Sequence, residues 1–146
     1  MADDVLLNKA AVIERCVRRV REAYADDPDG FSVSFDRQDV AILNVLRACQ
    51  AVLDVGQHLV RRERLGLPQS ARDVFGILAK AGWIEPSLAE AMKRMAGFRN
   101  IAVHDDQAIQ FPMLLNIIQH HLDEFLQFNR QILAFDGAAA KGEQAP

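Results

Sequence analysis

Apolar residues recur at steps of three and four along five stretches of the chain, and this spacing predicts five amphipathic α-helices. The predicted helices cover residues 4–24, 36–65, 70–82, 86–103 and 112–135. No alternating stretch is long enough to form a sheet, and the sequence shows no internal repeat. The pattern therefore predicts an all-α fold, an antiparallel bundle of about five helices.

Residues that favour turns separate the predicted helices. Pro28 and Gly30 end the first helical pattern. The next five residues alternate like a strand but are too few for one, so we expect a connecting loop anchored by its large apolar side chains, Phe31, Val33 and Phe35. Gly66 and Pro68 end the second helix, and Ser70 is a favourable N-cap for the third.

The second predicted helix carries a seam of apolar and small residues that suits packing against another helix, namely Ile42, Leu46, Cys49, Leu53, Gly56 and Val60. Gly56 on this seam would permit a close approach of the neighbouring helix. After Phe135 the chain contains no large apolar residue. We therefore expect one helical domain over residues 1–136 and a disordered tail over 137–146.

Composition narrows the class of protein. The 146 residues suffice for one domain with its own core, and 17 Lys plus Arg against 20 Asp plus Glu give a net charge of −3, which favours neither nucleic acid nor anionic membrane. Cys16 and Cys49 lie on apolar stripes, where buried thiols are common and a disulfide is not expected. With an acidic N-terminus and no membrane-length apolar run, the sequence predicts a cytoplasmic protein.

The candidate chemistry lies in RNIAVHDD, residues 99–106. On the fourth predicted helix, Arg99 falls in the middle of an apolar stripe formed by Leu88, Met92, Met95 and Ala102. One interpretation is that Arg99 is structural, with the aliphatic part of its side chain at the edge of the core and its charged end in solvent. The other is a functional cation placed beside His104.

A second stripe on the same helix is polar and consists of Lys93, Gly97, Asn100 and His104. Arg99 and His104 are five residues apart, so on an ideal helix their directions differ by about 140°. Both cannot point straight at one small target from the same chain. Either the helix ends between them, or two chains contribute to the site.

Other candidates are weaker. His120 and His121 are adjacent and face different directions, without the four-residue spacing of a helical zinc site, and His121 suits a core or interface position. The arginines at 61, 62 and 64 fit either a helix-dipole role or a phosphate-attracting patch. Glycine-rich phosphate loops, a CxxC pair and a GxSxG elbow are absent from the sequence.

Three stretches, at residues 37–60, 65–84 and 95–106, resemble the HepT-type HEPN-domain family, the ribonuclease toxins of MNT/HEPN (MntA–HepT) toxin–antitoxin systems. The resemblance covers about residues 6–135. The family signature is an arginine, four residues, a histidine, one residue and then usually a tyrosine. Arg99 and His104 match this signature, as does Asn100 after the arginine.

The resemblance implies a homodimer whose two motifs line one cleft and cleave RNA, tRNA or mRNA, without a metal or another cofactor. In that site Arg99 and His104 are the catalytic residues, and Asn100 and Asp105 support them. The implied partners are a second copy of the chain, an RNA substrate and a nucleotidyltransferase antitoxin of the MNT type, as in type VII-like toxin–antitoxin systems.

Asp106 departs from the family pattern, because the tyrosine usually found there is the residue that the antitoxin modifies with AMP. A carboxylate could form only a labile acyl phosphate, so stable tyrosine AMPylation at this position is excluded. Asp105 and Asp106 would also repel RNA phosphates, by about 1 kcal/mol per close pair. The sequence thus predicts an attenuated ribonuclease. The alternatives are a non-catalytic HEPN scaffold that binds the antitoxin, and a plain helical dimer.

Overall fold

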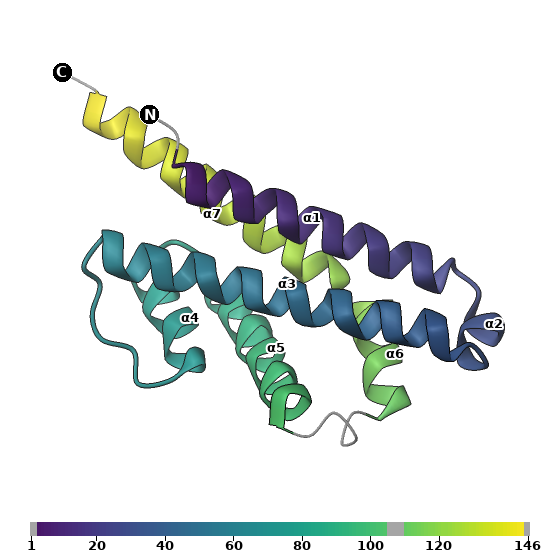
Figure 1. The fold of residues 1–146 in the computed structure, drawn as a ribbon. Helices are drawn as coiled ribbons and strands as arrows, with labels where there is room; N and C mark the ends of the chain where they lie inside the picture. The colour runs from purple at the N-terminus through teal and green to yellow at the C-terminus, as the bar shows by residue number, and fades with distance from the viewer. Residues whose placement is uncertain (1–2, 105–109, 145–146) are drawn as a thin grey trace.

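The structure is a computed structural model that describes residues 3–104 and 110–144, the last five by their backbone alone. These residues form seven α-helices and no strand, which confirms the all-α prediction. The helices, shown in Figure 1, are α1 (Asp4–Tyr24), α2 (Pro28–Ser32), α3 (Phe35–Arg62), α4 (Ala71–Lys80), α5 (Pro86–His104), α6 (Phe111–His120) and α7 (Leu122–Gln144).

Helix α3 is the central element of the bundle. It runs antiparallel to α1 along most of its length, and α7 lies against both of them (Figure 1). On its other side α3 contacts the pair formed by α4 and α5. The core between these helices is a single apolar cluster whose largest fully buried side chains include Phe31, Phe75, Phe125 and Phe128. Burial of this apolar surface is the main stabilising contribution to the fold.

The helix ends follow the capping residues that the sequence provides. The Asp3 carboxylate accepts from the backbone N–H groups of Val5 and Leu6 and so starts α1. Ser34 and Ser70 cap α3 and α4 in the same way. The predicted close approach at Gly56 is also present, because a Cβ atom there would clash with Val74 of α4.

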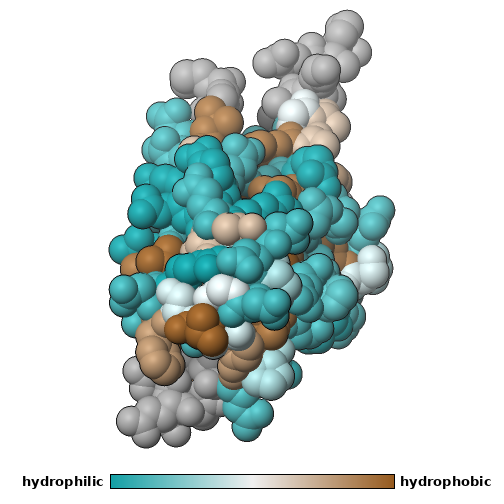
Figure 2. All heavy atoms as spheres, turned by 90° about the vertical axis from the view of Figure 1, so that its right-hand side faces the viewer, coloured by the Kyte–Doolittle hydropathy of each residue, from teal (hydrophilic) through white to brown (hydrophobic). Residues whose placement is uncertain are grey.

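The segment predicted to be a loop before α3 contains a short helix instead. Asp27 caps α2 and Pro28 occupies its first turn, where the missing N–H of proline costs nothing. Only Phe31 anchors the segment in the core; Val33 and Phe35 are 81% and 80% exposed, so the prediction that they anchor it is wrong. Figure 2 views the molecule from this end and shows a largely hydrophilic surface with small apolar groups.

The prediction of about five helices is too low because it misses α2 and also because the last predicted helix is divided in two. The apolar stripe predicted as one helix over 112–135 is divided at His121, whose φ of −125° and ψ of −5° separate α6 from α7. Helix α7 then continues to Gln144, through residues 137–144 that we expected to be disordered. Three consecutive alanines at 138–140 have the highest helix propensity of any residue type, which favours continuation of the helix.

A cluster of charged side chains joins three helices at the N-terminal end of α1. One oxygen of Asp3 lies 2.7 Å from Nε2 of His58 and accepts from Arg62 at 2.8 Å. Arg62 also donates to Asp136 of α7 at 2.8 Å. Partial burial alone would raise the pKa of Asp3, but the hydrogen bonds from His58, Arg62 and the α1 backbone outweigh it and lower the pKa to about 2.

We predict that this cluster makes the stability of the protein sensitive to acid. The folded pKa of Asp3 lies below its ordinary value of 3.8, so its contribution is complete above about pH 4 and is lost as the pH falls toward 2. Asp3→Asn should lower the free energy of unfolding by about 1 kcal/mol at neutral pH and flatten its decline in acid. Urea unfolding across this pH range measures both effects. The matched control Asp4→Asn removes the next carboxylate, which is exposed, and an equal effect there would contradict the prediction.

Candidate functional site

Helix α5 carries both residues of the predicted motif. Its buried face includes Leu88, Met92, Met95 and Ala102, as the apolar stripe predicts. Arg99 lies on this stripe and is half-buried, whereas Asn100 and His104 are exposed. The helix continues without interruption to His104. The alternative that the helix ends between Arg99 and His104 is therefore wrong, and their directions differ by about 140°.

Arg99 is held by a chain of polar side chains that crosses three helices. Its Nε donates to Oε1 of Gln50 on α3 at 2.7 Å. Gln50 donates in turn to Oδ1 of Asp54 at 2.7 Å, and Lys9 of α1 donates to Oδ2 of Asp54 at 3.0 Å. The hydrogen bond at Nε restricts rotation of the planar guanidinium about the Cδ–Nε bond, and with it the direction of the two terminal nitrogens. Those two nitrogens form the fork that matches two phosphate oxygens.

Gln50, Asp54 and Lys9 were not predicted as site residues. Gln50 and Arg99 are separated by 49 positions, and no local motif links them. The available signal is the spacing of Gln50 and Asp54, four apart on one face of a helix that is otherwise rich in apolar seam residues. Such a pair is common on solvated helix faces, so spacing alone could not identify it.

Asp105 and Asp106 lie outside the described residues, in the gap at 105–109. Their predicted roles, support of the site and replacement of the usual tyrosine, therefore stay predictions. The one tyrosine of the sequence, Tyr24, ends α1, and its hydroxyl accepts a hydrogen bond from Gln119 of α6 at 3.0 Å.

Two of the other candidates, Arg62 and His121, have structural partners. Arg62 belongs to the Asp3 cluster and lies over the Trp83 ring at 5.5 Å, which accounts for it without a phosphate ligand. His121 lies 2.8 Å from Glu124 through Nδ1, as expected of a satisfied core or interface residue. Both cysteines are buried thiols, and burial raises the pKa of Cys49 to about 12.

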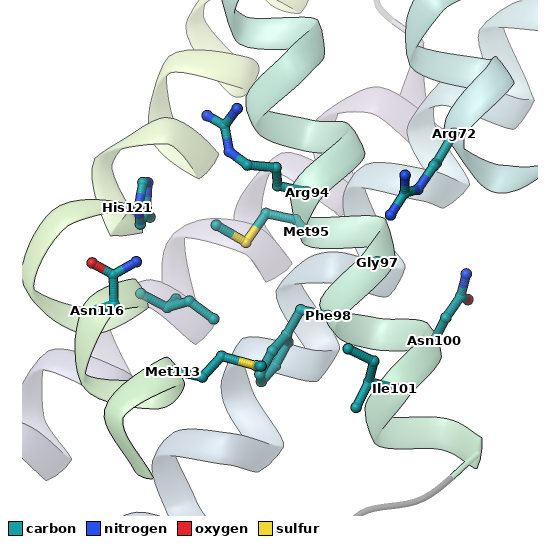
Figure 3. A pocket seen from close by; sticks show the side chains of 11 residues that line it. Arg72, Arg94, Met95, Gly97, Phe98, Asn100, Ile101, Met113, Asn116 and His121 are labelled. Carbon is teal, nitrogen blue, oxygen red and sulfur yellow. The ribbon is translucent and has the colours of Figure 1, made fainter. Parts of the chain in front are cut away.

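Within residues 3–104 and 110–144, no group of three or more His, Cys, Asp and Glu side chains is placed to hold a metal ion. The helices of the same residues include none that is long and apolar enough to cross a membrane. A pocket of about 450 Å³ opens along α5 next to Asn100, between α6 and Arg72 of α4 (Figure 3).

Comparison with known proteins places this arrangement in a family. The chain is 42% identical over 126 residues to the mRNA nuclease HepT of Shewanella oneidensis, covering 86% of this chain and 94% of that protein. It is also similar to a solved toxin–antitoxin structure with AMP-PNP, with a TM-score of 0.86. The identity is 42%, and the match covers 90% of this chain and 99% of that one.

A second solved structure, a tri-AMPylated HEPN toxin of Shewanella oneidensis in complex with its MNT antitoxin, matches with a TM-score of 0.85. Its identity is 41%, over 91% of this chain and 99% of that one. The profile of the ribonuclease HepT-like family matches residues 13–132, which include Arg99, His104 and the whole of α3 and α5. This chain therefore belongs to the HepT-like ribonuclease family.

Proposed function

We propose that this protein is the toxin of a type VII-like toxin–antitoxin pair, a metal-independent endoribonuclease of the cytoplasm that cleaves mRNA or tRNA at a site shared by two copies of the chain. The observation that carries the proposal is the unbroken α5. Arg99 and His104 diverge on that one helix, so a single chain cannot aim both at one phosphate. The activity of the HepT relative, which is named as an mRNA nuclease, supports the reaction class.

The chemistry also requires more catalytic groups than a single chain supplies. Cleavage of RNA without a metal needs a base for the 2′-OH proton, an acid for the leaving 5′-oxygen and a cation for the charged phosphorane. One histidine cannot be base and acid in the same step. Two copies of α5 facing each other would bring two His104 side chains as base and acid, and two Arg99 side chains as clamps.

Exposed apolar residues around Arg99 support contact with a second copy. Val103 follows Arg99 by one helical turn and is 61% exposed. On α3, Leu43 is also exposed and precedes Gln50 by seven residues, which keeps it on the same face of the helix. Exposed apolar residues beside the motif suit a dimer interface, since apolar surface patches often mark protein–protein contacts.

Gln50 has a positioning role in this proposal. It fixes Arg99 through Nε and is itself held by Asp54 and Lys9, so the arginine is oriented before RNA binds. Preorganised donors stabilise developing charge better than mobile ones, because they need no reorganisation during the reaction.

Asp106 favours an attenuated enzyme. Its carboxylate would repel the RNA phosphates and cannot carry AMP as a stable tyrosine adduct. The same residue supports the second candidate function, a non-catalytic HEPN scaffold whose role is to bind an MNT-type nucleotidyltransferase. In that case the fold and the antitoxin surface are retained without cleavage.

The first test is RNA cleavage by the purified protein in the presence of EDTA, with mRNA and tRNA substrates. We expect slow cleavage by the natural chain and faster cleavage by Asp106→Tyr. His104→Ala should reduce the rate by at least about 100-fold, the contribution expected of a general acid or base. His120→Ala, which removes another exposed histidine, is the matched control. Absence of cleavage by both the natural chain and Asp106→Tyr would contradict the proposal and favour the scaffold.

A second test separates positioning by Gln50 from structural support. Gln50→Leu should lower kcat about 10-fold with little change in KM, because Arg99 loses its orientation while the RNA contacts outside the motif persist. The free energy of unfolding should fall by only about 1 kcal/mol. Gln119→Leu removes a comparable hydrogen bond, to Tyr24, and should leave kcat unchanged. Equal kcat for the natural chain and Gln50→Leu would refute the positioning role.

A further inference from the structure

The pocket beside the motif has a rim of positive charge. Arg94 projects from α5 on one side, and Arg72 reaches in from α4 on the other (Figure 3). No carboxylate is among the described residues that line it. In a protein whose net charge is −3, two arginines without a lining carboxylate indicate an anionic ligand.

Gly97 explains how Arg72 reaches this position. The Arg72 guanidinium lies directly against the α5 backbone, so that a Cβ atom at Gly97 would be 2.6 Å from its Nη2. The glycine in the polar stripe of α5 thus provides the space in which one of the two cations sits.

The floor of the pocket suits a flat apolar group. Phe98, Met95, Met113 and Ile117 line it, and all of these residues except Met113 are almost fully buried. Aromatic rings and thioethers of this kind are the surfaces on which unpaired nucleobases stack. The volume of about 450 Å³ lies within the range of small-ligand pockets.

Two polar side chains, Asn116 and His121, lie beside that floor. Asn116 of α6 offers an amide donor and acceptor, whereas Asn100 lies on the opposite side of α5, next to Arg72 (Figure 3). His121 is fixed by the Glu124 carboxylate at Nδ1, which leaves Nε2 as the ring nitrogen able to meet a ligand. The second Glu124 oxygen is buried with no hydrogen-bond partner among the described residues. Side-chain amides and imidazoles are groups that hydrogen-bond with the edges of unpaired bases.

The pocket adjoins the cleavage motif. Asn100 lines it and directly follows Arg99 in the sequence, and His104 lies one turn further along α5, a rise of about 6 Å. A nucleotide whose base occupies the pocket would therefore place its neighbouring phosphate toward the motif.

We propose that this pocket is a base-recognition subsite, which receives one unpaired nucleobase of the RNA strand next to the cleaved phosphate. Phe98 and the two methionines contact the face of the base, and Asn116 and His121 contact its edge. Arg72 and Arg94 bind the flanking phosphates. The inference rests on the proposed ribonuclease activity and adds to it a source of sequence preference, since the Arg99–His104 chemistry acts on the backbone alone.

The test uses binding rather than cleavage, in a His104→Ala background that keeps the RNA intact. Short single-stranded RNAs that carry one abasic position each are titrated, with fluorescence anisotropy as the readout. We expect one abasic position near the cleavage point to weaken binding about 10-fold. Asn116→Trp, which fills the pocket from an exposed position, should abolish that difference. Arg94→Gln should weaken binding of every RNA, whereas Arg15→Gln, an exposed arginine of α1, should not.

Each outcome bears on one claim. An abasic effect that persists unchanged in Asn116→Trp would overturn the subsite while leaving the ribonuclease proposal intact. Loss of antitoxin binding by Asn116→Trp, with normal binding of every RNA, would overturn it in favour of a protein contact. If the natural chain neither binds nor cleaves RNA, the proposed function itself fails.

Discussion

The hydrogen bond between Arg99 and Gln50 is the contact on which the site depends. It joins α5 to the central helix α3, and through Asp54 and Lys9 it extends to α1. Arg99 would otherwise be a charge at the edge of an apolar stripe, where an arginine is free to turn toward solvent. With Nε 2.7 Å from Oε1 of Gln50, the orientation of the guanidinium is restricted by residues of α3 and α1. The fold therefore determines where the cation lies.

That fixed arginine and the unbroken helix together restrict what one chain can do. His104 lies on the same helix but faces about 140° away, so a single copy could not assemble the proposed site. A second copy, docked over the apolar residues beside the motif, would complete it. In the proposed dimer, an antitoxin would have two ways to block cleavage, by occupying the shared cleft or by separating the copies. Neither way requires a tyrosine at position 106.

The sequence predicted the parts of this structure that follow from local chemistry. The bounds of α1 and the start of α4 agree with their capping residues, and the stripe that includes Arg99 is found on α5. Helix α2 was missed because proline and glycine together resemble a turn. The break at His121 was missed because buried residues continue on both sides of it, so the helical period hardly changes. Neither Gln50 nor the pocket could be predicted, since both arise where distant segments meet.

A dimer in which only one chain is altered tests directly whether two chains share one catalytic site. The natural chain and His104→Ala, carrying different tags, are co-expressed and purified through both tags, and RNA cleavage by the mixed dimer is measured. A shared site needs both histidines, so we expect the mixed dimer to lose nearly all activity, like the doubly altered dimer. Half of the activity of the natural dimer would show that each chain works alone and that no site is shared.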